Sequence, residues 1–405
     1  MPASPLRLLP LASSFHSAEQ VVATVEAIGR DLEARGIPHR PVTDPAEADA
    51  LLVVTGGTEA LALRAAEARP GPVLLVAHPS QNALPASLEI LAHLRQAGRA
   101  GRIVLLNGKE EGYGQLRRAA GHLAARERLG RARLGRIGAP SDWLVASMPD
   151  PALVKAAWGP EVVDVSLAEV RDALAAADPA QVADRVRDFR SGASRVVEPS
   201  DRDLEMAARV TLALREVVAR HRLDACSVRC FELVTDLGTT GCLGLSALLD
   251  DGIVAGCEGD IPAALTMLWM QALGTGPAFM ANPQDLDAAT GTLWLAHCTI
   301  ARRLVKTYAL RSHFESSLGV GLQGEVPPGP VTLARVGGAD LRGLFVSDGE
   351  LDENGDSELR CRTQVRVRLE EGLDSLLERP LGNHHVLVPG HWARAMREYH
   401  AFVVA

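Results

Sequence analysis

Short runs of apolar residues alternate with longer segments of helical period through the first third of the chain. In the helical segments, apolar positions recur every three to four residues. Uninterrupted apolar strands between amphipathic helices are typical of a parallel sheet with helices on both faces. The pattern therefore predicts a Rossmann-like α/β domain over residues 1–137. Its predicted strands are 6–14, 50–55, 73–77 and 103–106.

The same alternation continues through the middle third of the chain, and it predicts a second α/β domain over residues 138–308. This domain is expected to carry the acidic candidate residues discussed below. Its predicted strands are 143–146, 162–165, 227–233, 253–257, 278–280 and 292–298, and its predicted helices are 152–156, 167–176, 201–220 and 261–273.

The pattern changes in the last hundred residues, where short strands are separated by turn signals. Asn354-Gly355 is a strong signal for a hairpin turn. Residues 309–405 are therefore predicted to form a small antiparallel barrel or sandwich with a closing helix. The predicted fold class is α/β: two Rossmann-like parallel-sheet domains, followed by a small antiparallel β-barrel-like C-terminal domain.

Composition narrows the class of protein. The chain has 405 residues, too many for one core, and 47% of them are hydrophobic. Its net charge of −8 argues against a nucleic-acid partner. No apolar run reaches the roughly 18 residues of a membrane-spanning helix, and the first fifteen residues make a poor signal peptide. The six cysteines form no CxxC pair, which predicts reduced thiols and a cytoplasmic protein. No membrane partner is expected, because no apolar run is long enough for a transmembrane helix.

The most informative segment is Cys257-Glu258-Gly259-Asp260, which follows an apolar strand and precedes a helical segment. Acids at the carboxyl end of a buried strand lie where α/β proteins bind ligands. Such a pair can hold a metal or move a proton. The structural alternative is a helix N-cap at Asp260, with Pro262 at the second helical position. That alternative requires Asp260 but not Glu258.

Two further groups carry possible chemistry. Glu232 lies near the end of the predicted strand 227–233, and His384 and His385 stand in a turn before a short strand. Carboxylates and an imidazole suit a divalent cation such as Mn²⁺ or Mg²⁺. The structural alternatives are a salt bridge for Glu232 and a polar turn for the two histidines. A metal site requires these groups to converge in the fold.

These motifs resemble the L-fucose isomerase and L-arabinose isomerase superfamily. One matching segment runs from the Cys-Glu-Gly-Asp turn through a helix and Gly274-Thr275-Gly276 to the apolar residues Phe279-Met280-Ala281. The other is the segment 383–391, Asn-His-His-Val-Leu-Val-Pro-Gly-His, which resembles the family's carboxy-terminal histidine motif. The resemblance by motif covers most of residues 220–405, and the first third matches in architecture only.

The resemblance implies a metal-dependent aldose–ketose isomerase that uses Mn²⁺ or another divalent cation such as Mg²⁺ or Co²⁺. Carried over by position, Asp260 matches an acidic ligand and His384 the histidine ligand. The family's other acid falls near Thr240-Gly241-Cys242, where this chain has none, so Glu232 is the proposed substitute. The resemblance also implies a small-molecule sugar substrate and a homo-oligomer, either a trimer or a hexamer.

Roles follow for the neighbouring residues. Glu232 and Asp260 are expected to act as ligands and acid/base groups, with Glu258 as a further catalytic candidate. His385, Asp236 and Arg229 are the candidates for supporting or substrate-binding positions. The expected reaction moves a proton from C2 to C1 of an open-chain sugar through a cis-enediolate, whose charge a divalent cation stabilises.

Two alternatives remain open at the level of sequence. The missing acid near Gly241 suggests a catalytically inactive sugar-binding or regulatory protein on the same scaffold. The second alternative is another metal-assisted reaction, an epimerase or lyase step, on a modified, anionic sugar. The arginines that could hold its anionic group are Arg229, Arg302, Arg303 and Arg311, although solvated arginines are the simpler interpretation.

Overall fold

The computed structural model describes residues 5–404 and divides the chain into two compact units. The first unit comprises the described residues up to Arg126 together with the segment from Arg397 onward, and the second is Glu127–Met396. The predicted fold class is confirmed, because the structure contains parallel-sheet α/β parts and a closed antiparallel barrel of six strands. The domain boundaries predicted at residues 137 and 308 stay predictions.

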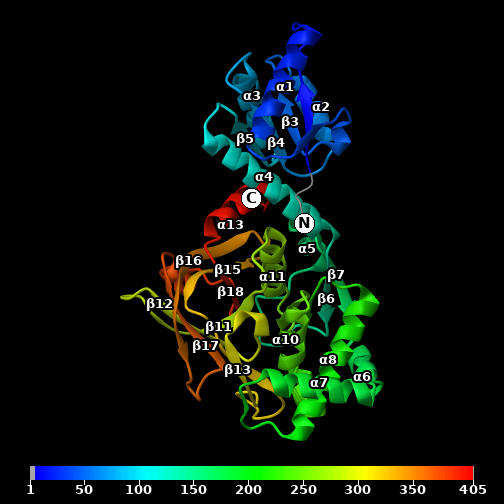
Figure 1. The fold of residues 1–405 in the computed structure, drawn as a ribbon, viewed down its shortest axis with the longest axis vertical. Helices are drawn as coiled ribbons and strands as arrows, with labels where there is room; N and C mark the ends of the chain where they lie inside the picture. Colours follow the sequence, from blue (N-terminus) through cyan, green and yellow to red (C-terminus); the bar gives the residue numbers. More distant parts are fainter. Residues whose placement is uncertain (1–4, 405) are drawn as a thin grey trace. The chain divides into compact units, whose positions relative to one another are not determined.

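The first unit is built on a five-stranded parallel sheet with the order β2-β1-β3-β4-β5 (Figure 1). Along β1, Leu6 and Leu8 pack in one apolar cluster while Leu9 and Leu11 pack in another, so both faces of the sheet are covered. The strands are β1 Leu6–Leu11, β2 His39–Pro41, β3 Ala50–Val53, β4 Val73–Ala77 and β5 Gly101–Leu105. The helices are α1 Ala18–Ala34, α2 Glu59–Glu67, α3 Ala83–Gln96 and α4 Glu110–Arg131.

The second unit begins with a four-stranded parallel sheet whose order is β10-β9-β6-β7. Its strands are β6 Arg133–Ile137, β7 Glu161–Val165, β9 Ala225–Val228 and β10 Val254–Cys257. The helices are α5 Pro151–Ala157, α6 Leu167–Ala175, α7 Pro179–Gly192, α8 Asp201–His221, α9 Phe231–Leu237, α10 Cys242–Asp250 and α11 Ile261–Leu273.

Two sequence-based assignments in this region are wrong. The strand predicted over 227–233 ends at Val228, and α9 begins at Phe231, because a short apolar run does not by itself distinguish a strand from a helix. Residues 143–146, predicted as a strand, form turns in which Trp143 and Val145 are exposed.

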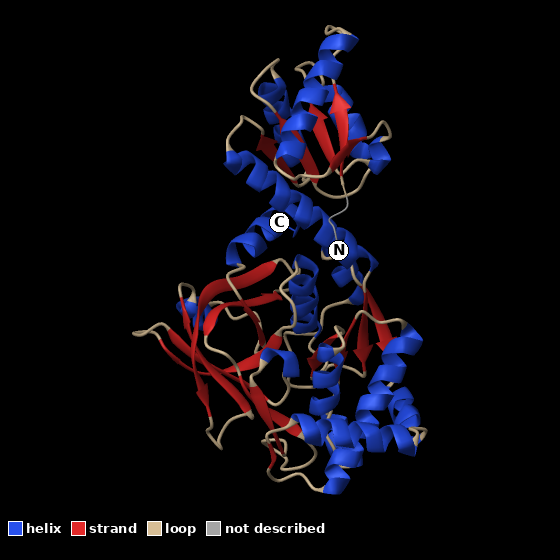
Figure 2. Ribbon diagram, viewed as in Figure 1, coloured by secondary structure: helices blue, strands red, loops and turns tan. Residues whose placement is uncertain are grey.

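The remaining strands of the second unit close into a six-stranded antiparallel barrel with the order β11-β12-β17-β16-β15-β18 (Figure 2). Leucine and valine side chains fill its core, among them Leu295, Leu333 and Val367. The strands are β11 Phe279–Asp287, β12 Thr292–His297, β15 Gly329–Gly337, β16 Gly343–Gly355, β17 Thr363–Leu369 and β18 His385–Pro389. A small sheet adds β8 Arg195–Val196, β13 Thr307–Arg311 and β14 Gly321–Glu325, and the last helices are α12 Leu373–Glu378 and α13 Ala393–Tyr399.

The hairpin turn predicted at Asn354-Gly355 is wrong, because both residues belong to β16 and Gly355 pairs with Gln364. The turn follows them. The Asn354 side chain instead satisfies a neighbouring loop: its Nδ2 donates to the carbonyl oxygen of Val326, and its Oδ1 accepts from the Val326 amide.

Helix α11 connects the second sheet to the barrel. It packs against β10 and β9 on one side and against β15 and β18 on the other, and almost all of its side chains are buried. The carboxyl end of β10 therefore faces barrel strands within the same compact unit. Among residues 5–404, no helix is long and apolar enough to cross a membrane.

Candidate metal and catalytic site

The turn after β10 has an unusual backbone. Glu258 and Gly259 both have positive φ values, +62° and +75°. Glycine adopts this left-handed conformation without strain, but glutamate rarely does. A Cβ atom on residue 259 would lie 2.6 Å from the Pro140 Cα, so only glycine fits there. The turn separates the directions of the two acids and places Asp260 at the start of α11.

Asp260 is a fully buried anchor. Its Oδ1 accepts from the Ala263 amide at 2.8 Å, which confirms the predicted N-cap. Its Oδ2 accepts from Arg335 Nη1 at 3.1 Å and from His384 Nδ1 at 3.0 Å. Burial alone would raise the pKa of Asp260, but the Arg335 and His384 charges outweigh it and hold the pKa at about 2. Asp260 is therefore ionised, and it orients the His384 ring.

Arg335, on β15, is as deeply buried as its partner, with no exposed side-chain surface on either residue. Its remaining donors reach the carbonyl oxygens of Leu381 and His384 and the Ser147 hydroxyl. One guanidinium thus joins the α11 start, the loop before β18 and the loop before α5.

His384 presents its second ring nitrogen to the candidate site. Because Asp260 accepts from Nδ1, Nε2 is left over, and it makes no hydrogen bond within the described chain. Glu258 Oε1 lies 3.4 Å from this Nε2. Burial would lower the pKa of His384, but the Asp260 and Glu258 carboxylates raise it to about 9. In a histidine that binds a metal, one ring nitrogen is typically hydrogen-bonded to a carboxylate, and the other is left for the metal.

Glu258 stands across from that nitrogen and is almost fully buried. Its Oε2 accepts from Trp143 Nε1 at 2.6 Å. Burial alone would raise the pKa of Glu258, but His384 and the Trp143 hydrogen bond together lower it below its ordinary value. The carboxylate is therefore ionised at neutral pH, and Oε1 remains open toward the site.

His297 completes the group, although the sequence analysis missed it. It is the last residue of β12, and its ring centroid lies 5.6 Å from that of His384. Cys257, Glu258 and His297 each offer a ligand atom, and these atoms lie within 4.8 Å of one another. Burial, together with the His384 charge, lowers the pKa of His297 to about 3, so its imidazole is neutral and can bind a cation. A histidine that ends an apolar strand was the one available signal.

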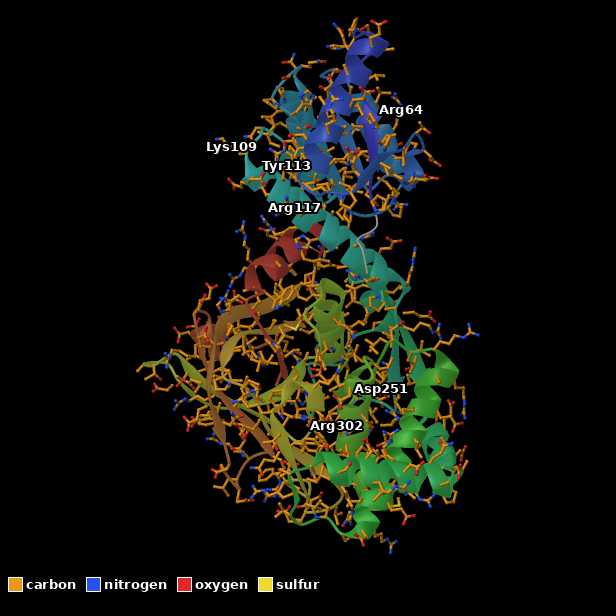
Figure 3. The ribbon with its side chains drawn as sticks, in the orientation of Figure 1. Arg64, Lys109, Tyr113, Arg117, Asp251 and Arg302 are labelled. Atoms are coloured by element: carbon orange, nitrogen blue, oxygen red, sulfur yellow. The ribbon has the colours of Figure 1, made fainter. Side chains whose placement is uncertain are left out.

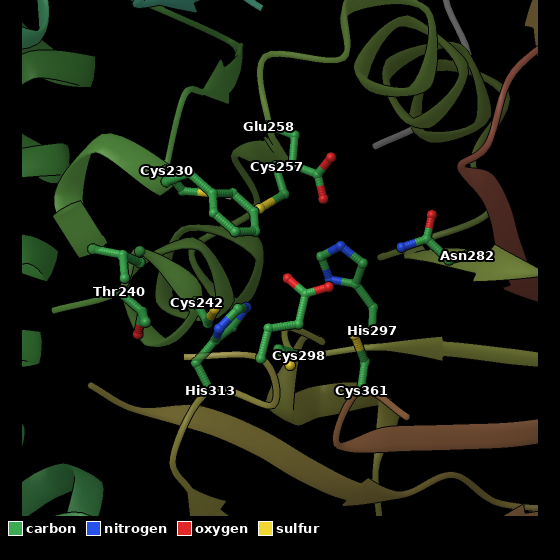
Figure 4. Close-up of a pocket in the computed structure, with 14 residues that line it drawn as sticks. Cys230, Thr240, Cys242, Cys257, Glu258, Asn282, His297, Cys298, His313 and Cys361 are labelled. Carbon is green, nitrogen blue, oxygen red and sulfur yellow. Dashed lines mark hydrogen bonds between the residues drawn. The ribbon is translucent and has the colours of Figure 1, made fainter. Parts of the chain in front are cut away.

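Cys257, Glu258 and His297 line a cavity (Figure 4), whereas His384 is not among its lining residues. In the close-up, the labelled Glu258 and His297 lie on the cavity wall with Asn282 and His313. Among the described residues that line it there are two carboxylates, Glu258 and Glu315, and no Lys or Arg. Five cysteines also line it: Cys230, Cys242, Cys257, Cys298 and Cys361.

The other sequence-predicted residues lie outside the group of Glu258, His297 and His384. Glu232, on α9, is paired with Arg229, and its Oε2 is buried without a hydrogen-bond partner in the described chain. Its neighbour Phe231 lines the cavity. Asp236 forms a half-exposed ion pair with Arg171. The ligand role of Glu232 and the supporting roles of Asp236 and Arg229 stay predictions.

His385 is buried beside, rather than in, the cavity. Its ring packs edge-on against Phe345, with 5.3 Å between centroids, and burial lowers its pKa to about 3. The candidate anion-binding arginines are already paired within the protein. Arg302, labelled in Figure 3, and Arg303 contact Asp250. Arg311 contacts Glu198 and Glu358.

An α/β scaffold with a closed barrel, and an acid–histidine cluster where the two meet, is consistent with the fucose isomerase-like class that the sequence resembles. No family model matches the chain. A sulfoquinovose isomerase of Alkalicoccus urumqiensis is 28% identical over 214 residues, which are 49% of this chain and 47% of that protein. One from Clostridium sp. (strain MSTE9) is 34% identical over 94 residues, 23% of this chain and 21% of that protein. One from Priestia megaterium is 27% identical over 101 residues, 24% of this chain and 23% of that protein.

The first of these matches spans about half the length of that curated relative. Sulfoquinovose isomerases of this kind belong to the L-fucose isomerase-like superfamily, so the similarities support the resemblance drawn from the Cys-Glu-Gly-Asp and His384 motifs.

The buried ion pair between Asp260 and Arg335 leads to a stability prediction. In Arg335→Met the Asp260 charge stays buried without its cation, so we expect the free energy of unfolding to fall by roughly 3–5 kcal/mol. Adding Asp260→Asn should recover part of that loss. Denaturant unfolding of the two single variants and the double variant measures the coupling. Arg187→Met, which removes an exposed ion pair with Asp184, is the control and should change stability by less than about 0.5 kcal/mol. Equal effects of Arg335→Met and Arg187→Met would refute the anchoring role.

The turn glycine provides a second test. Gly259→Ala adds a Cβ against the Pro140 backbone, whereas Gly252→Ala adds one at a similar positive φ, +86°, with no atom within 4 Å. Both variants pay the left-handed strain of roughly 1–2 kcal/mol. We expect Gly259→Ala to lose at least about 1 kcal/mol more than Gly252→Ala, because of the clash. Thermal or urea unfolding measures the difference, and equal losses would contradict the close packing of this turn.

Proposed function

We propose that this protein is an aldose–ketose sugar isomerase whose site holds a divalent cation between Glu258, His297 and His384. The observation that carries the proposal is the orphaned Nε2 of His384, which Asp260 holds in place opposite the open oxygen of Glu258. The names of the sulfoquinovose isomerase relatives support the reaction class. Asp260 orients His384 in this proposal, and the ligand role of Glu232 stays a prediction, because Glu232 is paired with Arg229 and is not among the residues that line the cavity.

The donor set fits a cation of intermediate softness. Imidazole nitrogens favour borderline transition metals, and carboxylates favour harder ions, so a mixed set suits Mn²⁺ or Co²⁺ better than Mg²⁺. When bound, such a cation would stabilise negative charge on the O1 and O2 atoms of an open-chain sugar. The neutral His297 ring and the ionised Glu258 are already in the protonation states that cation binding requires, whereas His384, whose pKa is raised to about 9, has to release a proton when the cation binds.

Glu258 is the proposed acid/base group. Its ionised carboxylate can take a proton from C2 of the sugar and return it at C1 through a cis-enediolate, while the hydroxyl proton on O2 moves to O1, so that the aldose becomes a ketose. The Trp143 hydrogen bond fixes Oε2 and so holds the carboxylate in place, with Oε1 facing His384. The buried walls of the cavity limit access of water to the reacting atoms.

The substrate is proposed as a class, an open-chain aldose. The relatives are named for a sulfonated sugar, whereas the described cavity lining carries two carboxylates and no Lys or Arg. A panel of neutral, phosphorylated and sulfonated sugars therefore belongs in the test.

One alternative is a sugar-binding protein without catalysis. The pairing of Glu232 with Arg229 favours it, because Glu258 is then the one acid in the cluster of Cys257, Glu258 and His297, whereas the expected reaction uses two acids. A homo-oligomer and a cytoplasmic location remain proposals from the resemblance and the cysteine content.

The experiment follows exchange of the sugar C2 hydrogen in deuterated water by NMR, with chelator-treated protein to which Mn²⁺ or Co²⁺ is restored. We expect exchange and ketose formation only with the cation. Glu258→Gln and His384→Ala should each lower turnover by at least about 10²–10⁴-fold, because the base or its partner is removed. Asp260→Asn should weaken cation affinity, measured calorimetrically, by about 10–100-fold.

The matched control is His391→Ala, which removes a half-exposed histidine paired with Glu350 and should keep full turnover. Undiminished turnover in the metal-free protein or in Glu258→Gln would refute the proposal. Tight sugar binding without exchange would favour the binding protein.

A further inference from the structure

The thiols of this chain are concentrated at one place. Five of its six cysteines line the candidate cavity, and they come from separate segments of the second unit. Cys230 immediately precedes α9, Cys257 ends β10, and Cys242 begins α10. Cys298 follows β12 and Cys361 precedes β17. The proposed isomerase reaction uses none of these sulfur atoms, so their gathering calls for a separate explanation.

Cys230 and Cys257 are already in contact. Their Sγ atoms lie 2.8 Å apart, although the residues are 27 positions apart in the chain. The contact forms because β9 and β10 are neighbouring parallel strands, with Cys257 aligned to Val228, and Cys230 follows two residues later. A disulfide bond requires a separation of about 2.05 Å between the two sulfur atoms. The Sγ atoms of Cys230 and Cys257 would therefore have to approach each other by less than about 1 Å.

We propose that Cys230 and Cys257 form an oxidative modification site, at which a peroxide-class oxidant converts the two thiols to a disulfide and reversibly inactivates the adjoining site. In the first step hydrogen peroxide oxidises one thiol to a sulfenic acid and is reduced to water. In the second step the other thiol attacks that sulfur, the S–S bond forms, and a second water leaves. The net change is two thiols and one peroxide to one disulfide and two waters, which balances atoms and electrons.

The contact with Glu258 explains why this bond would inactivate the site. Cys257 is bonded directly to Glu258, which is held at a φ of +62° by the packing of its turn. The Cys257 Sγ also belongs to the group of ligand atoms within 4.8 Å of one another, with Glu258 and His297. Drawing this sulfur toward Cys230 shifts the backbone that aims the Glu258 carboxylate at His384. Because both thiols line the cavity, a small oxidant reaches them by the route a substrate would take.

A second thiol pair provides the competing outcome. Cys298 and Cys361 also share a hydrogen bond, and Cys361 is partly exposed. Cys298 follows the proposed ligand His297 in the sequence. Cys361 lies in the loop between β16 and β17 and is adjacent to no proposed ligand. The Cys230–Cys257 pair is favoured because it borders the proposed acid/base residue.

The test starts with the reduced full-length protein, freed of reductant and treated with hydrogen peroxide. Remaining thiols are alkylated, and linked peptides are identified by mass spectrometry. We expect a peptide pair joined through Cys230 and Cys257, with two fewer free thiols per chain. We also expect cation affinity and sugar turnover to fall at least tenfold and to return after treatment with dithiothreitol.

The variants compare each protein with its own reduced sample. Cys230→Ser should not be reversibly inactivated, whereas Cys361→Ser should remain as sensitive to peroxide as the wild type. Linkage of Cys298 to Cys361 alone, no linkage at all, or equal reversible inactivation of Cys230→Ser would overturn the proposal. The activity arm rests on the proposed function, but the peptide linkage does not. A Cys230–Cys257 link in a protein that turns over no sugar in either state would therefore support the modification site while refuting the isomerase.

Discussion

The ion pair between Asp260 and Arg335 is the interaction on which the arrangement of the site depends. Both side chains are fully buried, where an unpaired charge is strongly unfavourable, so each requires the other. Arg335 also binds the carbonyl oxygens of Leu381 and His384 and the Ser147 hydroxyl. One pair of charges therefore fixes the start of α11, a barrel strand and two loops. The position of His384 follows from this pair.

The site needs both the parallel sheet and the barrel of the second unit. Glu258 follows the last residue of β10, His297 ends β12, and His384 immediately precedes β18. Residues at the ends of rigid strands are held more precisely than residues on long loops, which suits a cluster that must keep fixed distances. The closed barrel thus contributes two of the three proposed ligands, and α11 joins its strands to the sheet that contributes the third.

Local patterns in the sequence were enough to predict the fold class and the start of α11, because periodicity and helix capping act within a few residues. The partners of the site residues were not predictable in this way. Arg335 lies 75 positions from Asp260, and His384 lies 124 positions away. His297 was missed because a single histidine at a strand end carries no spacing signal. The closure of the barrel through β12 and β17 likewise joins segments about seventy residues apart.

Glu258 and Asp260, which are separated by one glycine, differ in how many further hydrogen bonds each carboxylate can accept. A carboxylate can accept about four hydrogen bonds. Asp260 receives contacts from the Ala263 amide, from two nitrogens of Arg335 and from His384, which use all of them. Glu258 receives one firm hydrogen bond, from Trp143, and keeps free lone pairs beside an orphaned imidazole nitrogen. Burial and a lowered pKa are common to both acids, so neither property identifies the reactive one. The unfilled acceptor positions distinguish them, and they favour Glu258 as the proposed acid/base group and cation ligand, with Asp260 as the proposed support of His384.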